Sequence, residues 1–359
     1  MLQDDDLYFD NIKCANHWRQ PVESELTADF QSDWQAQLGG NGDTSGVSRM
    51  VLHLRNGFEK YWLTTLQPFL KTKEDLRKKY LSRFWLLFFI SLFILPVFAI
   101  GIYLLNRRFS QDIDPGLFYM LVAVFVFIIQ TPYRSYKKKI KNDVMEKFIA
   151  YFGNWRYEHN SPFLVSEIKE SKIFPHAREY DTDDCFIGTY RDVKLCVCEQ
   201  ILKSHPDKKG RQNILFQGIA IKIHLNKNFE GETIVLKDLG IFNRFKGFSG
   251  LERITLEDPY FEKLFEVYGS DQVESRYLLT PVFMERIVKL KDLYKGKSIQ
   301  LSFKNDVLLL AIDTKQDMFE PCSFFKTNLN KFKIDTVFEQ FLTIFSIVDI
   351  LRLSQKIGM

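Results

Sequence analysis

The sequence contains few cysteines, and none has a spacing that a disulfide framework or a metal centre requires. Of its 359 residues only five are cysteine, an odd number at irregular intervals, which argues against a disulfide framework. There is no CxxC pair and no nearby histidine to complete a zinc site. Cys196 and Cys198 share one face of an expected strand, where we expect them to pack as small apolar residues. The sequence predicts no metal and no cofactor.

Motifs for phosphate binding and nucleophilic catalysis are also missing. The stretch "YKGKS" (294–298) has Lys291 where a phosphate-binding loop needs glycine, and "GFSG" (247–250) is one residue short of a nucleophile elbow. The six histidines form no HExxH-type pair. In "YDTDDC", Asp181, Asp183 and Asp184 offer oxygen ligands to a divalent cation, but a solvated acidic turn is the simpler interpretation. No catalytic residue follows from these patterns.

Basic residues are concentrated in two short segments. The chain has 49 Lys and Arg against 45 Asp and Glu, a net charge of +4. Twelve of the basic residues flank two apolar runs, where membrane topology and anionic lipid headgroups account for them. No general basic surface remains, so we expect no nucleic-acid partner.

The most prominent feature of the sequence is a pair of long runs without charged residues. Residues 84–105 and 116–133 carry no Asp, Glu, Lys or Arg, and only about ten residues separate them, so they predict a transmembrane helical hairpin. Six Lys and Arg precede the first run and six follow the second, whereas the loop between them has two. Both chain termini are therefore expected in the cytoplasm. The opening "MLQDDD" is acidic where a secretory signal is basic.

The rest of the chain divides around this hairpin (84–133). Residues 1–47 form an acidic, partly flexible segment that ends in "LGGNGDTSG". Residues 48–83 predict a juxtamembrane helical stalk that Pro68 interrupts, with apolar side chains at helical spacing. These are Val51, Leu54, Phe58, Trp62 and Leu66. Residues 134–359 predict a cytoplasmic α+β domain.

The α+β domain is predicted from a change of period after residue 155. A helix continues past the second span, and short segments rich in Ile, Val and Phe then predict antiparallel strands at 183–202, 213–226, 232–238 and 251–258. A helix is expected from Asp258 to about Gly269, and a hairpin turning at Asn305 and Asp306. The last helix, 335–355, is interrupted by charge, so we expect it to pack against an antiparallel sheet.

A dense polar stretch, "DQVESR" (271–276), is the strongest candidate for a site. Asp271 and Glu274 have the spacing of a capping box, in which Glu274 reaches back to the first N–H groups of its own helix. Thr280 before Pro281 predicts a second helix start. Tyr277 and Leu278 are expected to point inward, and the Arg276 guanidinium is expected to clamp an acid, internal or from a partner. The candidate interaction or pocket residues are Asp271, Gln272, Glu274, Arg276, Tyr277 and Glu285.

The segments "FEVYGSDQVESRYLLTPVFMER", "CFIGTYRDVKL" and "LNKNFEGETIVL" together resemble an uncharacterised bacterial inner-membrane family, domain of unknown function three-one-three-seven. The similarity covers about 148–353 and the two preceding spans. The resemblance implies a two-span protein of the bacterial inner (plasma) membrane with a soluble C-terminal domain and LemA-like membrane protein partners. It supplies no catalytic residues.

These observations favour a non-enzymatic, membrane-anchored cytoplasmic module that binds an envelope-associated protein partner. One alternative is an enzyme acting on a lipid-linked or envelope substrate, with Asp271, Glu274 and Arg276 around a pocket. The other is a lipid-binding domain that uses the basic flanks. A cleft in which the two carboxylates converge on Arg276 would separate the enzyme from the module. The sequence does not indicate an oligomeric state.

Overall fold

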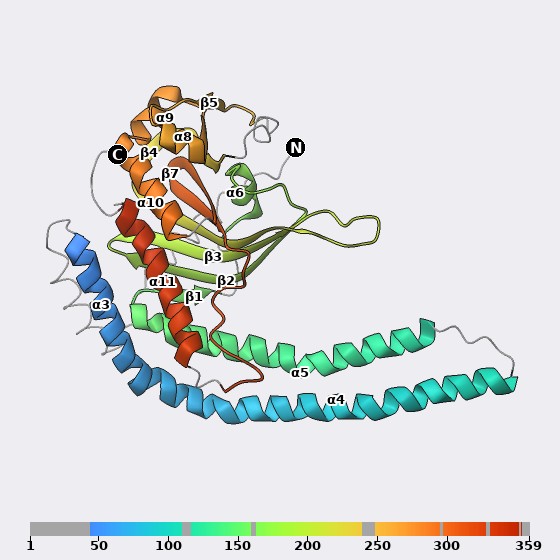
Figure 1. Cartoon of the computed structure of the whole chain (residues 1–359). Helices are drawn as coiled ribbons and strands as arrows, with labels where there is room; N and C mark the ends of the chain where they lie inside the picture. Colours follow the sequence, from blue (N-terminus) through green and yellow to red (C-terminus); the bar gives the residue numbers. More distant parts are fainter. Residues whose placement is uncertain are drawn as a thin grey trace, which may run out of the picture. The chain divides into compact units, whose positions relative to one another are not determined.

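The chain folds into two compact units, shown in a computed structural model (Figure 1). The structure describes residues 44–109, 116–158, 163–238, 248–294, 297–327, 331–351 and 353. Leu52–Tyr151 and Glu320–Phe338 form a helical unit, and Phe152–Phe319 with the chain from Glu339 onward forms a sheet unit. The predicted α+β class, with two long apolar helices before an antiparallel sheet, is confirmed. Most of the acidic segment predicted at 1–47 lies outside the described residues.

The helical unit begins with a nearly continuous helix whose buried side chains recur every fourth residue. It consists of α3 (Thr44–Tyr61), a π-helical turn η1 (Trp62–Leu66) and α4 (Gln67–Phe109). The stripe consists of Leu54, Phe58, Trp62, Leu66 and Leu70, each at most 3% exposed. Four residues of an α-helix turn by about 400°, so such a stripe drifts by about 40° at each step. The wider π turn reduces this drift and keeps the stripe against one neighbour.

Pro68 does not interrupt the stalk as predicted, because α4 begins at Gln67 and continues through it. A proline ring clashes with the carbonyl four residues earlier and removes one backbone hydrogen bond. That carbonyl belongs to Thr64, which lies inside the π turn. The altered hydrogen-bond pattern of the turn accommodates the proline without ending the helix.

Helix α5 (Gly116–Ile149) lies beside α4 and continues into a short 3₁₀ turn, η2 (Ala150–Phe152) (Figure 1). Both helices are long and apolar enough to cross a membrane, and only 6% of the apolar window of each is buried. A helix from the core of a soluble protein would have most of that window covered. The two predicted spans therefore present their apolar side chains outward.

The sheet unit contains seven antiparallel strands among the described residues. They are β1 (Arg156–Glu158), β2 (Glu179–Tyr190), β3 (Val193–Lys203), β4 (Ile214–Lys237), β5 (Glu252–Ile254), β6 (Phe265–Gly269) and β7 (Ser298–Asp313). Their order is β1-β2-β3-β4-β6-β5, and β7 pairs with the other edge of β4. Arg191 and Asp192 join β2 to β3 with φ angles of 48° and 62°, as the two central residues of a type I′ turn require.

Strand β4 was predicted as two strands and is one strand of 24 residues. The turn-like "NKNFEGE" is absorbed by two register shifts against β7, between His224 and Phe229 and between Phe229 and Glu232. On the opposite edge, β3 pairs with β4 as far as Ile223 and β6 pairs from Thr233 onward. Turn residues therefore mark bulges here and not a chain reversal.

Two further strand predictions were wrong in the same region. Residues 298–313 form one strand, β7, and Asn305 takes a φ of 54° at the bulge opposite Phe229 where a hairpin turn was expected. Helix α8 (Pro259–Leu264) ends five residues before Gly269, because "FEVYG" becomes the fully buried strand β6. The pairing of β6 with β4 on one edge and with β5 on the other outweighs the local helical pattern at these five residues.

Helices cover both faces of the sheet. On one face, α6 (Val165–Glu170) contributes Ile168 to an apolar cluster that includes the thiols of Cys185, Cys196 and Cys198. Cys196 and Cys198 lie 3.9 Å apart through their sulfur atoms, so their prediction as buried core residues on one strand face is confirmed. On the other face, Phe341 of α11 (Lys331–Leu351) packs edge-on against Phe186 of β2.

Candidate functional site

The polar stretch after β6 starts two helices, as predicted. Asp271 precedes α9 (Gln272–Leu278), and its Oδ1 accepts hydrogen bonds from the N–H groups of Val273 and Glu274 at 2.7 and 3.0 Å. The Thr280 hydroxyl accepts one from the N–H of Phe283 at 3.3 Å at the start of α10 (Pro281–Leu293). These side chains satisfy helix N–H groups that would otherwise have no acceptor.

Glu274 binds a strand and not its own helix, so the predicted capping box is wrong. Its carboxylate accepts hydrogen bonds from the N–H groups of Glu230 at 3.1 Å and Gly231 at 2.7 Å. The Ser270 hydroxyl accepts one from the next N–H, that of Glu232, at 2.8 Å. A side chain at Gly231 would place Cβ 2.8 Å from the Glu274 carboxylate. The stretch therefore satisfies three consecutive N–H groups at the bulge of β4.

The other predicted site residues are dispersed over the surface of α9 and α10. Gln272 donates a hydrogen bond to Glu252 at 3.0 Å. Glu285 pairs with Lys289 at 2.9 Å, and this pairing lowers the pKa of the Glu285 carboxyl. Among the described residues, Arg276 has no hydrogen-bond or ion-pair partner, so the expected internal clamp is not formed.

Tyr277 was expected to point inward and is 59% exposed, with the Lys227 ammonium 4.4 Å above its ring. Leu278 is fully buried, as predicted. The Asp271 and Glu274 carboxylates are engaged by backbone N–H groups and do not converge with Arg276 on a cleft. By the geometric criterion given above, the enzyme built on these three residues is not supported.

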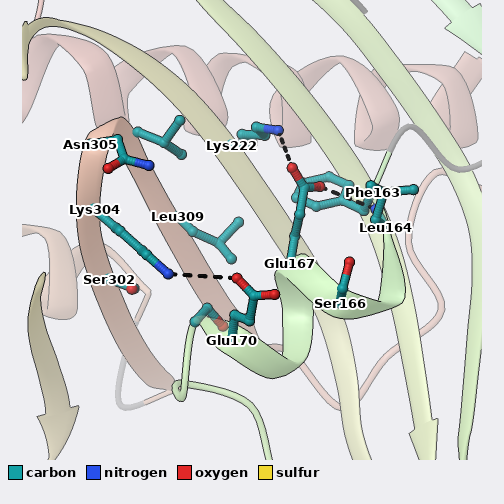
Figure 2. Close-up of a pocket in the computed structure, with 12 residues that line it drawn as sticks. Phe163, Leu164, Ser166, Glu167, Glu170, Lys222, Ser302, Lys304, Asn305 and Leu309 are labelled. Carbon is teal, nitrogen blue, oxygen red and sulfur yellow. Dashed lines mark hydrogen bonds and ion pairs between the residues drawn. The ribbon is translucent and has the colours of Figure 1, made fainter. Parts of the chain in front are cut away.

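A pocket on the α6 face of the sheet is a site that the sequence did not indicate (Figure 2). Its volume is about 490 Å³, within the size range of small-ligand sites. Leu309 and Val307 of β7 and Phe163 before α6 supply apolar walls. Leu164, which is 42% exposed, lies on its lining at the start of α6. The cavity thus has apolar walls that continue onto an exposed apolar residue.

Two ion pairs border this pocket (Figure 2). Lys222 of β4 contacts Glu167 at 2.6 Å, and Lys304 of β7 contacts Glu170 at 3.5 Å. The second oxygen of Glu167 accepts a hydrogen bond from the N–H of Leu164 at 3.1 Å. Both oxygens of Glu167 are therefore engaged by the protein itself. The alternation in "IKIHL" (221–225) sets Lys222 apart from its buried neighbours, and it is the one local signal that could have pointed to this face.

Carboxylates gather at a second place, where β2 and β3 pair. Asp183, Asp184 and Glu199 bring one oxygen each within 4.8 Å of one another. Asp184 and Glu199 are fully buried. The Tyr157 hydroxyl donates to Asp184 at 2.6 Å, and the Met318 N–H donates to Glu199 at 3.0 Å. Oxygen ligands of this type suit a divalent cation, so these three residues could hold one within the sheet unit.

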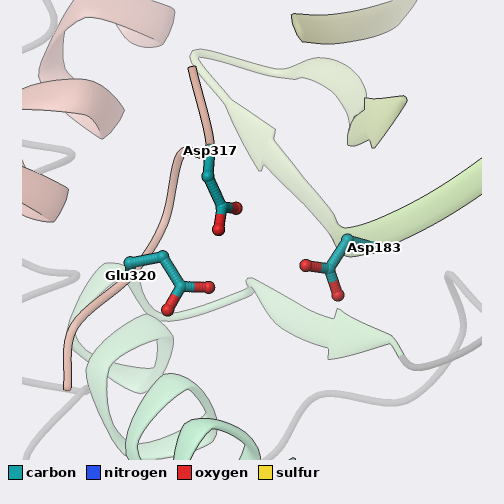
Figure 3. A group of neighbouring side chains, drawn as sticks. All are labelled: Asp183, Asp317 and Glu320. Carbon is teal, nitrogen blue, oxygen red and sulfur yellow. The ribbon is translucent and has the colours of Figure 1, made fainter. Parts of the chain in front are cut away.

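The acidic segment before Cys185 is thus not a solvated turn, because β2 runs through it. Asp181 at its start pairs with Lys203 at 2.5 Å. Figure 3 shows Asp183 with Asp317, and both side chains are exposed. Glu320, also drawn there, is bound by Lys141 within the helical unit at 2.6 Å. Acidic neighbours alone do not make a metal centre, so no function is assigned to them.

A buried acid also fixes α11 to the β2–β3 turn. Asp349 has a side chain that is 6% exposed, and it contacts the Arg191 guanidinium at 3.1 Å. The Tyr190 hydroxyl donates to it at 2.9 Å, and the Tyr190 ring stacks on Phe345 at 4.5 Å. Burial raises the pKa of the Asp349 carboxyl, and Arg191 and Tyr190 oppose this rise. The acid therefore retains its proton to a higher pH in the folded chain than in the unfolded chain.

We expect Asp349→Asn to change how stability depends on pH. A raised folded pKa means that the Asp349 contribution is fully present below the unfolded value of 3.8 and is lost as pH rises through the folded pKa. Asparagine does not titrate and can still accept from Tyr190. The free energy of unfolding of the variant minus that of the wild type should therefore increase with pH across this window. Urea titrations at several pH values test this, and a difference that decreases with pH would contradict it.

Comparison with known proteins identifies a domain without an assigned activity. Residues 214–353 match the family described as "Protein of unknown function (DUF3137)". The resemblance inferred from the sequence is confirmed for these residues. No curated protein matches the chain. The crystal structure of the mycobacterial trehalose monomycolate transport factor A aligns with a TM-score of 0.32 at 10% identity, over 59% of this chain and 96% of that one. A likeness this distant carries no argument about function.

Proposed function

We propose that this protein is a non-enzymatic binding module anchored in the bacterial inner membrane, with both termini in the cytoplasm. In this proposal the sheet unit binds an envelope-associated membrane protein, of the LemA-like kind that the family resemblance implies. The pocket beside α6 receives an apolar side chain of that partner. The observation that carries the proposal is the form of this pocket, which has apolar walls and four charged side chains that are paired with each other.

The polar groups of the pocket support binding over catalysis. A general base needs a free carboxylate oxygen within reach of a substrate, whereas Glu167 has both oxygens engaged by Lys222 and the Leu164 N–H. The Ser171 hydroxyl donates to the carbonyl of Ile168 at 2.7 Å. The lining contains no histidine or cysteine to activate a serine. Apolar walls with a paired polar rim suit the insertion of a side chain.

The membrane location is supported by the two outward-facing apolar helices. Their apolar windows are almost wholly exposed, which would be costly in water and is favourable in lipid. Basic residues precede the apolar run of α4 and follow the apolar run of α5. They favour a cytoplasmic location for both flanks. The same flanks attract anionic lipid headgroups.

We expect blocking the pocket to abolish partner binding. A photo-crosslinking amino acid placed at the exposed Leu164 in the full-length protein should give a discrete protein adduct in intact cells. Ser166→Trp should remove this adduct, because Ser166 is exposed and lines the pocket. Lys169→Trp is the matched control, since Lys169 is exposed on the same helix but lies outside the lining.

The two tryptophan variants decide the outcome of this experiment. An adduct lost in Ser166→Trp and kept in Lys169→Trp supports the proposal. An adduct that both variants retain would place the partner elsewhere and overturn the assignment of the pocket. An adduct with lipid instead of protein would favour the lipid-binding alternative.

A further inference from the structure

The segment that follows the sheet is fastened to the two long helices at several points. Glu320 contacts Lys141 and Lys137 of α5 at 2.6 and 3.1 Å. The Arg77 guanidinium of α4 donates to the carbonyl of Phe324 at 2.9 Å, while Glu74 holds it from the other side at 2.7 Å. Arg77 is 8% exposed, so these contacts are sheltered from solvent and fix the path of the segment.

Phe324 inserts its ring between the helices that carry the two apolar runs. It is 4% exposed. Its ring centroid lies 5.7 Å from that of Phe84 in α4, and 5.4 and 5.3 Å from those of Tyr133 and Tyr136 in α5. Contacts at these distances are favourable aromatic pairs. The segment is thereby placed at one definite level along both helices.

Phe325, the next residue, packs against two of the same rings but remains exposed. Its side chain is 58% exposed, and its ring lies 5.6 Å from Phe84 and 6.5 Å from Tyr133, stacked on the latter at 19°. Phe324 is buried and Phe325 is exposed at the same level, so one aromatic ring anchors the segment and the other keeps an open face beside the two helices. Nothing in the helical unit covers the outer face of Phe325 among the residues that the structure describes.

Phe325 lies where the chain enters the apolar hairpin in α4 and where it leaves the hairpin in α5. Phe84 is the first residue of the first charge-free run and Tyr133 is the last residue of the second. Arg83 and Arg134 stand immediately outside these runs. Aromatic rings concentrate where acyl chains meet headgroups, and basic side chains just outside attract lipid phosphates. Phe325 and the exposed Lys326 repeat this order.

We propose that Ser323–Lys326 is a membrane-contacting loop. Phe325 enters the boundary between acyl chains and headgroups, and Lys326 binds lipid phosphate beside it. The partner of this surface is the bilayer itself, because the loop adjoins the apolar hairpin without a break. This inference rests on the membrane location proposed above, and it adds a third point of lipid contact from a segment nearly two hundred residues beyond the hairpin.

Phe332 provides a matched contrast in the same unit. It is 76% exposed at the start of α11. Its neighbour Lys331 pairs with Glu59 of α3. Glu59 precedes Phe84 along a nearly continuous helix by roughly 37 Å at about 1.5 Å per residue. Two exposed phenylalanines of one segment thus lie at different levels, one at the apolar hairpin and one far from it.

Quenching of tryptophan by brominated lipid tests the proposal. The full-length protein is placed in nanodiscs of mixed zwitterionic and anionic lipid, with or without bromine near the top of the acyl chains. Trp85 lies inside the first apolar run and is 43% exposed, so it reports membrane insertion. In a Trp85→Phe background, Phe325→Trp should be quenched as strongly as Trp85 is in the wild type. Phe332→Trp should add no quenching.

The possible outcomes distinguish a failure of the loop proposal from a failure of the proposed membrane location. If wild type and Trp85→Phe are quenched equally, the apolar hairpin is not in the bilayer and the membrane location fails. If Trp85 is quenched but Phe325→Trp is not, or if Phe332→Trp is quenched equally, the loop proposal fails and the membrane location stands. Thermal unfolding of each variant confirms that it has folded before quenching is measured.

Discussion

Gly188→Ala is expected to lower the free energy of unfolding of the sheet unit by about 3 kcal/mol, because the new methyl group overlaps a buried ring. A Cβ at Gly188 would lie 2.1 Å from Cδ2 of Trp155. Trp155 is 4% exposed, and its indole N–H donates to the carbonyl of Thr189 at 3.1 Å. Its ring also packs against Phe345 of α11. The ring cannot move without losing these contacts. Urea unfolding followed by fluorescence measures the change.

A double-mutant cycle shows whether the overlap with Trp155 is the cause. Trp155→Leu is destabilising in its own right because it removes a large buried side chain. In that background, Gly188→Ala should cost far less than in the wild type, since the clashing ring is gone. Equal costs in both backgrounds would show that the loss comes from the β2 backbone and not from Trp155.

Glu274→Ala should cost about 2 kcal/mol, the second largest effect, because it leaves two backbone N–H groups of β4 without their acceptor. Glu274 accepts from Glu230 and Gly231, at the stretch of β4 that neither β3 nor β6 pairs with. Glu274→Gln retains one acceptor oxygen, so it should lower the free energy of unfolding by only part of this amount. Hydrogen exchange at the Glu230 and Gly231 amides should accelerate in both variants.

Glu285→Ala is the control for Glu274→Ala, since both residues are glutamates of the same polar region. Glu285 is paired with Lys289 in open solvent, and exposed pairs of this kind contribute little to stability. We expect no measurable change from it. Equal effects of the two substitutions would show that Glu274 acts through its charge alone and not through the β4 amides.

Helix starts were predicted well because their signals are local. Asp258 before Pro259, Asp271 before α9 and Thr280 before Pro281 each precede a helix in the structure. A capping side chain reaches only two or three residues ahead, so sequence spacing contains the information needed. The apolar spans were predictable for a similar reason, since length and charge alone define them.

What the sequence could not show depends on contacts between distant residues. The spacing of Asp271 and Glu274 is the same whether Glu274 caps its own helix or reaches β4, and the bulge of β4 decides between the two. The sequence-based prediction divided β4 and β7 at turn residues because the pairing that keeps each strand continuous also joins distant residues. The pocket was missed because its lining joins Ser166 of α6 to Lys304 and Leu309 of β7, and no pattern within either segment reveals the other.

The length of β4 affects the order in which the protein can be assembled during synthesis. Its Gly218 pairs with Asp313 and its Val235 with Leu301, so one whole edge of β4 has no partner until the ribosome has passed β7. Pairings of such high sequence separation form slowly. Meanwhile, the unpaired N–H and C=O groups of this edge stay open in a chain that also carries segments able to enter a membrane, which is the condition in which nascent chains aggregate or recruit chaperones.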